Sequence, residues 1–139
     1  MAAEKNYENR MKKFLESQGI YALGTPTQKQ VVAPCGYYEK RWAGGTFTKS
    51  GLPDLHIEIN GYSVDVEVKS PTYKPTELQL RNIKQINSSK GIAFVSYEHQ
   101  KHVELCAQWI NRTYPQYSDT PIKNFEDFKE LVKKLLENS

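Results

Sequence analysis

Residues 49–79 read KSGLPDLHIEINGYSVDVEVKSPTYKPTELQ, and this stretch decides the fold. At its centre, Asn60-Gly61 separates two segments in which apolar and polar residues alternate. Such alternation on both sides of Asn-Gly is the strongest short-range signal of a β-hairpin with a type I′ turn. A two-residue loop also fixes the register, so Ile59 should oppose Tyr62 and pairing should continue outward along both strands. The apolar pairs then share one face, which should be the buried one.

The polar face of this hairpin should bring Asp54 opposite Glu67. Like charges directly opposite each other on a sheet repel, because their Cβ atoms lie roughly 5 Å apart. The two carboxylates therefore need a cation between them or a shifted pKa. A divalent metal held by both, with water in its open positions, would answer this need, and Lys69 would lie beside it as a point charge for a phosphate or an activated water. The alternative is a solvated charged sheet face, which is the commoner role of such residues.

The order of these residues resembles the PD-(D/E)XK nuclease signature, because Pro53-Asp54 is followed by Glu67-Val68-Lys69. The surroundings are similar to the VRR-NUC branch, which is common in phage and bacterial genomes. In that branch a G-x-P-D stretch, an E-x-K strand and a helix-opening Gln follow in this order, and here Gly51 and Gln79 occupy the first and last positions. The resemblance covers about residues 4–97 of the chain.

The resemblance implies a metal-dependent DNA endonuclease, of a kind that includes enzymes acting on branched or flapped DNA. It implies an α/β fold with a restriction-endonuclease-like αβββαβ core, in which helices flank a mixed four-stranded sheet. The ion would be Mg²⁺ or Mn²⁺, held by Asp54, Glu67, the Val68 carbonyl and Glu8. The implied catalytic residues are Asp54, Glu67, Lys69, Gln79 and Glu8.

The choice of Glu8 depends on the family pattern, in which a first-helix glutamate precedes a helix-ending glycine, here Gly19. Glu4, one turn earlier on the same face, is the alternative metal ligand. Without the resemblance, Glu8 would be interpreted as a helix-edge residue paired with Lys12. Gln79 would likewise be an ordinary exposed helix residue.

The composition describes one domain of 139 residues, with 38% hydrophobic and 25% charged residues. No apolar run approaches the roughly 20 residues that a membrane span needs, and the first residues are too polar for a secretory signal. Two cysteines, Cys35 and Cys106, cannot form a disulfide framework, so we expect reduced thiols and a cytoplasmic protein. The net charge of +3 permits nucleic-acid binding without arguing for it.

Apolar spacing predicts the remaining elements. Thr76 and Asn124 should cap two of the helices, and Lys90-Gly91 should end one. Strand, helix, strand at this spacing predicts a right-handed crossover, so the strand after Gly91 should lie parallel to the Glu67 strand. The predicted helices span 4–18, 76–89, 99–112 and 125–138, and the predicted strands outside the hairpin span 28–33 and 92–97. Residues 98–139 would form a C-terminal helical extension.

A segment rich in aromatic and basic residues precedes the hairpin. Such a mixture suits a nucleic-acid surface, where bases stack and phosphates pair with cations. The alternative is a hairpin whose aromatic side chains cover the core edge while its charges face water. The candidate DNA-binding residues are Lys40, Arg41, Trp42, Lys49 and, after the hairpin, Lys74.

Three further readings stay open. His99 and His102 could share a helix face as a metal pair, but the surface-helix interpretation is favoured because no third ligand lies at a suitable spacing. The apolar terminal helix could pair with a second copy in a homodimer, or cover its own sheet. For the function, the main alternative to the nuclease is a catalytically inactive module that binds DNA or docks a partner. Another alternative function is an enzyme acting on a phosphorylated metabolite.

Overall fold

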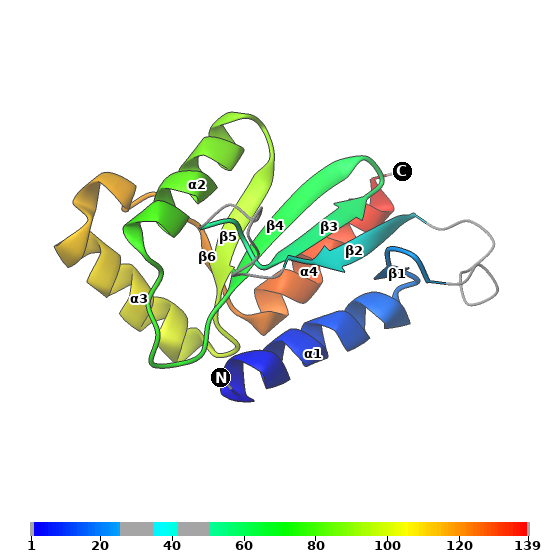
Figure 1. Cartoon of the computed structure of the whole chain (residues 1–139), viewed down its shortest axis with the longest axis horizontal. Coiled ribbons are helices and arrows are strands. Elements are labelled where there is room, and N and C mark those ends of the chain that lie inside the picture. Colours follow the sequence, from blue (N-terminus) through cyan, green and yellow to red (C-terminus); the bar gives the residue numbers. More distant parts are fainter. Residues whose placement is uncertain (1, 26–34, 42–50, 139) are drawn as a thin grey trace.

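A mixed sheet of six strands, in the order β1-β2-β3-β4-β5-β6, forms the centre of the molecule (Figure 1). The structure is a computed structural model and describes residues 2–25, 35–41 and 51–138. The strands are β1 (Tyr21–Ala22), β2 (Gly36–Lys40), β3 (Leu55–Ile59), β4 (Tyr62–Val68), β5 (Ile92–Ser96) and β6 (Ile122–Lys123). The helices are α1 (Ala2–Ser17), α2 (Glu77–Ser88), α3 (Gln100–Thr113), the short 3₁₀ helix η2 (Pro115–Tyr117) and α4 (Phe125–Glu137).

The sheet is larger than the four strands expected from the sequence. Strand β3 is antiparallel to both of its neighbours, β2 and β4, and β5 runs parallel to β4, as predicted. Three of the described strands lie outside the predicted strand ranges. β2 falls in the aromatic and basic segment before the hairpin, and β1 and β6 are parallel edge strands of two residues each, β1 beside β2 and β6 beside β5. Two residues carry no alternation that a sequence pattern could reveal, so only the neighbouring strand defines them. The strand expected at 28–33 lies outside the described residues.

The hairpin register agrees with the prediction. Ile59 pairs with Tyr62, and the pairing continues to Leu55 opposite Val66. Asn60 and Gly61 have φ angles of 48° and 85°, the positive values that a type I′ turn requires. The apolar residues of β3 are fully buried, so the expected face is the core face.

Asn60 has a second role that the turn signal does not reveal. Its side-chain nitrogen Nδ2 donates hydrogen bonds to the carbonyl oxygens of Leu135 and Leu136, at 3.0 and 3.2 Å. These carbonyls belong to the last turn of α4, where helical backbone acceptors have no partner within the helix. The hairpin turn therefore also caps the C-terminal helix.

Replacing Asn60 separates these two roles. Asp tolerates the left-handed backbone but cannot donate, and it brings a negative charge to the negative end of α4. We expect Asn60→Asp to lower the free energy of unfolding by about 1–2 kcal/mol, measured by urea denaturation. Asn60→Gly, which keeps the turn and removes the cap without adding charge, should cost less. Equal stability of Asn60→Asp and the wild type would contradict the capping role.

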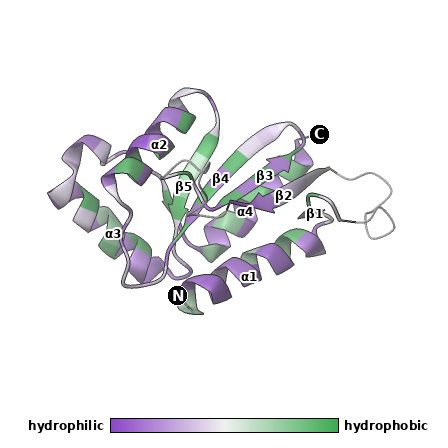
Figure 2. Cartoon of the chain, viewed as in Figure 1, coloured by the Kyte–Doolittle hydropathy of each residue, from purple (hydrophilic) through white to green (hydrophobic). Residues whose placement is uncertain are grey.

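The helices cover the two faces of the sheet in pairs (Figure 1). One apolar core joins α1 and α4 to the hairpin, and it contains Met11, Leu15, Val66, Phe128 and Val132. A second core joins α2 and α3 to β5. Figure 2 shows hydrophobic residues concentrated in β4 and β5, whereas the visible side of α1 is largely hydrophilic. Both layers are those expected for the α/β class.

The apolar face of α4 lies in the core of its own chain, since Phe128 and Val132 are fully buried. The homodimer stays a prediction, but this helix no longer supplies the free apolar surface that motivated it.

Helix α2 begins at the predicted cap Thr76, and it ends where Lys90 adopts a positive φ and the Gly91 N–H donates to the Ile86 carbonyl. Cys35 and Cys106 are free thiols. Within the described ranges, no helix is long and apolar enough to span a membrane.

Candidate active site at the end of strand β4

Asp54 lies just before β3, at the end of β4 that carries Glu67. The Arg41 N–H donates to the Asp54 carbonyl oxygen at 2.7 Å, which extends the β2–β3 ladder by one residue. The Val68 N–H donates to the Asp54 carboxylate oxygen Oδ2 at 3.0 Å. These two bonds hold the Asp54 side chain against β4, where the predicted register needs it.

Glu67 is 2% exposed, so its carboxyl group is almost completely removed from bulk solvent. Among the residues that the structure describes, none donates a hydrogen bond to its buried oxygen Oε1. Burial raises the pKa of Glu67 to about 9, with a further increase from the negative charge of Asp54 and from a hydrogen bond to it. Two carboxylates so close cannot both ionise cheaply, so in the metal-free protein the pair holds a proton at neutral pH.

Lys69 completes the local group. Its ammonium Nζ lies 3.6 Å from Glu67 Oε2, and its side chain is largely buried. The Lys69 N–H donates to the Ser96 carbonyl oxygen at 3.0 Å, which continues the pairing of β4 with β5. The cation is thereby held at the carboxyl ends of two parallel strands, where α/β proteins commonly bind ligands.

The two glutamates of α1 lie in different surroundings. Glu8, the metal ligand implied by the resemblance, is buried and forms ion pairs with Lys40 at 2.5 Å and Lys12 at 3.1 Å. Glu4 is the one coupled to the pair, because burial and the charge of Asp54 raise its pKa, and its own charge raises that of Glu67. Within the described part of the chain, no three His, Cys, Asp or Glu residues are placed together to hold a metal ion.

Gln79 forms a capping box with Thr76. Its N–H donates to Thr76 Oγ1 at 3.1 Å, and its side-chain oxygen accepts from the Thr76 N–H at 2.9 Å. The pattern Thr-x-x-Gln before an apolar helix is a sequence signature of this box, so the signal was present beside the family pattern. The capping role accounts for the side-chain oxygen and leaves the amide NH₂ group for any further contact.

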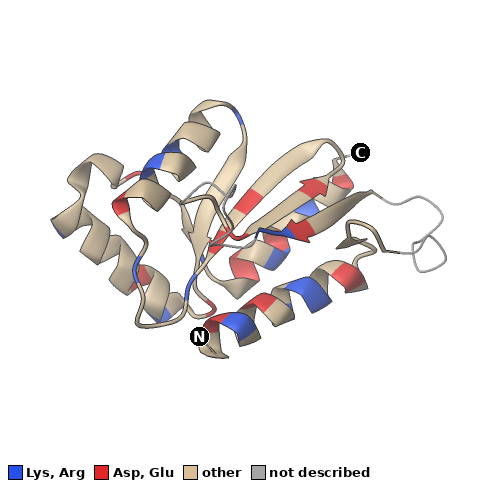
Figure 3. Cartoon of the chain, viewed as in Figure 1, with Lys and Arg blue, Asp and Glu red and all other residues tan. Residues whose placement is uncertain are grey.

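Two of the candidate DNA-binding residues make ion pairs within the chain. Lys40 pairs with Glu8, and Arg41 pairs with Asp65 at 2.8 Å. Figure 3 shows acidic and basic residues mixed along α1 and acidic residues along the strands of the hairpin, so basic residues are not segregated on these elements. Lys74 is partly exposed in the loop before α2, and Trp42 and Lys49 lie outside the described residues.

A polar network on the sheet adjoins the Asp54–Glu67 pair and was not predicted as a unit. The His56 ring contacts Asp65 at 2.8 Å through Nδ1 and Glu58 at 3.0 Å through Nε2. The hydrogen bond to Asp65 is the main reason that the pKa of His56 is raised. Ser63 donates to Glu58 at 2.7 Å. Since its members satisfy one another, we assign this network to the stability of the sheet.

The close packing of Gly51 on α2 positions the loop that carries Asp54. Gly51 has a φ of +78°, and a Cβ there would lie 2.7 Å from Leu78 Cγ and 2.9 Å from Asn82 Nδ2. Asn82 also donates to the Gly51 carbonyl oxygen at 2.9 Å. The glycine of the G-x-P-D stretch therefore allows the backbone to approach the helix closely.

We expect Gly51→Ala to lower the free energy of unfolding by about 2–3 kcal/mol, because it adds a steric clash to an unfavourable φ. Gly24→Ala is the matched control. Gly24 has a φ of +91° but no atom within 4 Å of the added Cβ, so this change should cost about 1 kcal/mol. Chemical denaturation of both variants measures the difference, and equal losses would contradict the packing argument.

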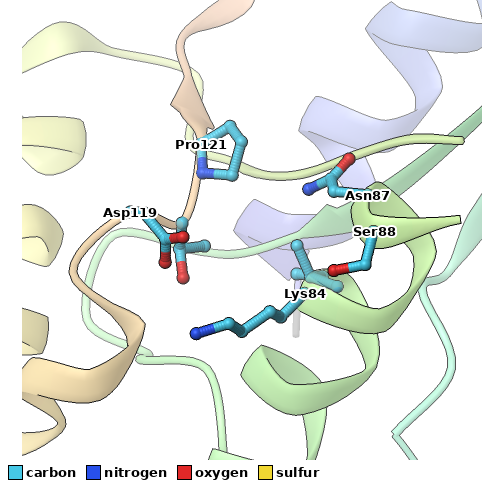
Figure 4. Close-up of a pocket in the computed structure, with 7 residues that line it drawn as sticks. Lys84, Asn87, Ser88, Asp119 and Pro121 are labelled. Atoms are coloured by element: carbon cyan, nitrogen blue, oxygen red, sulfur yellow. The ribbon is translucent and has the colours of Figure 1, made fainter. Parts of the chain in front are cut away.

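A cavity of about 260 Å³ lies between α2 and the loop before β6 (Figure 4). None of the predicted site residues lines it. Its Asn87 amide is hydrogen-bonded to the backbone of Ala93 through both Nδ2 and Oδ1, so this side chain is structural. The cavity brings together no group of side chains that suggests a reaction.

The comparisons with known proteins assign no family. No protein-family model matches the chain, and no curated protein matches it either.

Proposed function

We propose that this chain is a metal-dependent DNA endonuclease that hydrolyses phosphodiester bonds, built on a restriction-endonuclease-like core. The order α1, β2, β3, β4, α2, β5 supports that core, with β1 and β6 as added edge strands. The observation that carries the proposal is the buried Glu67 carboxyl beside Asp54, with one oxygen that no described residue contacts by a hydrogen bond. A purely structural sheet face has no need of such a pair.

The donor set suits Mg²⁺ or Mn²⁺, because these ions are commonly bound by one or two carboxylates together with waters and substrate phosphates. Asp54 and Glu67 would hold the ion with the Val68 carbonyl. On α1 either Glu4 or Glu8 would contribute, and Glu4 is favoured because Glu8 is already bound to Lys40 and Lys12. The chemistry that the ion supplies is activation of a water molecule and polarisation of the phosphate.

The chain's own residues orient the reactants. Lys69, held beside Glu67, would position the attacking water and help to deprotonate it, and it would stabilise negative charge developing on the phosphate. Gln79 would act through its amide NH₂ group, since its oxygen belongs to the helix cap. Lys74 and Lys69 are the described candidate cations for the DNA backbone, while Lys40 and Arg41 would have to exchange an ion pair for a phosphate.

The test uses end-labelled linear, flapped and four-way DNA, each incubated with the full chain in Mg²⁺, Mn²⁺ or EDTA. The expected result is cleavage of at least one substrate in either metal and none in EDTA. Binding without cleavage on every substrate would instead favour the inactive DNA-binding or docking module.

A further inference from the structure

A second cavity, of about 220 Å³, opens beside the candidate active site. It lies at the carboxyl ends of β4 and β5, between the first turns of α1 and the start of α3. Lys69 belongs both to this cavity and to the group around Glu67, so the two sites are adjacent. The polar residues that line it include Asn6, Arg10, Lys69, Glu98, His99 and His102.

The charge of this cavity is unbalanced toward positive. Its carboxylate, Glu98, forms an ion pair with Arg10. The Arg10 guanidinium donates to both carboxylate oxygens, through Nε at 2.6 Å and through Nη2. This pair joins α1 to the segment before α3 and cancels its own charge. The further cationic or proton-accepting groups are Lys69, His99 and His102. Lys69 Nζ also lies 3.6 Å from Glu67 Oε2, and His99 Nε2 lies 3.9 Å from Glu98 Oε1, so three such groups and Arg10 share one lining carboxylate and the Glu67 carboxyl.

The surroundings of His102 indicate the same excess of positive charge. Its pKa is lowered, first by burial and then by the positive charges of Lys101, His99 and Lys74. His99 stands at the N-cap of the 14-residue helix α3, and its side chain makes no cap hydrogen bond. The positive end of α3 therefore adds to the field of the cationic side chains.

A metal ion fits this cavity poorly. His99 and His102 lie with ring centroids 6.5 Å apart, but the carboxylate beside them is bound to Arg10, and Lys69 would repel a cation. A compact anion with several acceptor oxygens matches the donors instead, because lysine, protonated histidine and amide groups all donate to phosphate. A volume of this size also suits a small group better than a whole nucleoside.

We propose that this cavity binds a phosphate group of the nucleic-acid strand, next to the phosphodiester that is cut. The inference rests on the proposed function and deepens it, since it names the subsite that sets the strand against Lys69. The phosphate is either an internal diester or a terminal monoester, which share the same oxygens. The DNA path then follows the α1–α3 side of the molecule and not the ion-paired Lys40 and Arg41.

The first test needs neither metal nor cleavage. The chain has three histidines, so the ring signals of His56, His99 and His102 can be followed separately by NMR while inorganic phosphate is added in EDTA at constant ionic strength. We expect the signals of His99 and His102 to shift saturably and to titrate at higher pH with phosphate. His56, which is enclosed by Asp65 and Glu58, is the internal control and should not move. Unmoved signals of His99 and His102, or equal shifts of all three, would overturn the proposal.

The second test uses the double variant His99→Gln/His102→Gln on cleavable DNA. We expect KM to rise roughly tenfold with little change in kcat, because two phosphate donors are weakened while the carboxylate pair is intact. Lys134→Gln, on the exposed side of α4, is the control for a general loss of positive charge. An unchanged KM in the double variant would overturn the subsite even if the wild type cleaves DNA. Conversely, phosphate binding without cleavage would leave the subsite standing while the endonuclease proposal fails.

Oligonucleotides with a 5′-phosphate or a 5′-hydroxyl separate the two sources of the phosphate. A KM that is several-fold lower for the phosphorylated strand, and equalised by the double variant, assigns a terminal monoester. Equal KM values for both strands in the wild type, raised together in the double variant, assign an internal diester.

Discussion

Glu67→Gln should abolish metal-dependent DNA cleavage, lowering the rate by at least about a thousandfold in a protein that stays folded. The amide keeps the shape of the buried side chain but carries no negative charge, so it binds a divalent cation far more weakly. Asp54→Asn should have the same effect, and its side-chain oxygen can still accept the Val68 N–H bond that holds the loop in place. Single-turnover cleavage of the best DNA substrate, at saturating Mg²⁺ and Mn²⁺, measures both losses.

Glu58→Gln is the matched control for these variants. It removes a carboxylate from the same polar face of β3, where Glu58 contacts His56 and Ser63 rather than the Asp54–Glu67 pair. Its cleavage rate should stay within a few fold of the wild type. A Glu67→Gln protein that cleaves at the full rate would exclude the proposed role of this carboxylate, whatever the behaviour of Glu58→Gln.

Glu67→Gln should also stabilise the folded protein when metal is absent. The folded-state pKa of Glu67 is raised from 4.5 to about 9, so as pH rises through this range the unfolded chain releases a proton that the folded protein retains. By linkage, the contribution of this group to stability then falls with increasing pH. Glu67→Gln removes that loss, and we expect it to be more stable than the wild type at pH 8 by about 1–3 kcal/mol, with little difference near pH 4.

Urea denaturation in EDTA at several pH values between 4 and 8.5 measures this difference. Glu58→Gln serves again as the control, because it leaves the Asp54–Glu67 pair intact. Adding Mn²⁺ should reverse the order at pH 8, since binding to the folded state stabilises the wild type but not the variant. A Glu67→Gln protein less stable than the wild type at pH 8 without metal would contradict the protonated pair.

Signals between near neighbours in the chain were sufficient for the central hairpin. Asn60-Gly61 specifies its own turn conformation, and a two-residue loop leaves only one register for the flanking apolar residues. The caps at Thr76 and Asn124 and the parallel placement of β5 were likewise predictable, because each depends on residues close together or on the handedness of a short crossover. These elements place the backbone of Asp54, Glu67 and Lys69 at one end of the sheet.

The rest depended on contacts between residues far apart in sequence. The edge strands β1 and β6 exist only because a neighbouring strand pairs with them. Lys40 reaches Glu8 from β2 and pairs with it, whereas Glu4 is the α1 glutamate whose charge acts on Glu67. Asn60 caps a helix from the other end of the chain, and the cationic cavity forms only where α1, β4 and α3 meet. Burial and electrostatic pairing act through space, so the sequence determined the local elements, whereas the tertiary structure decided the partners of the charged side chains.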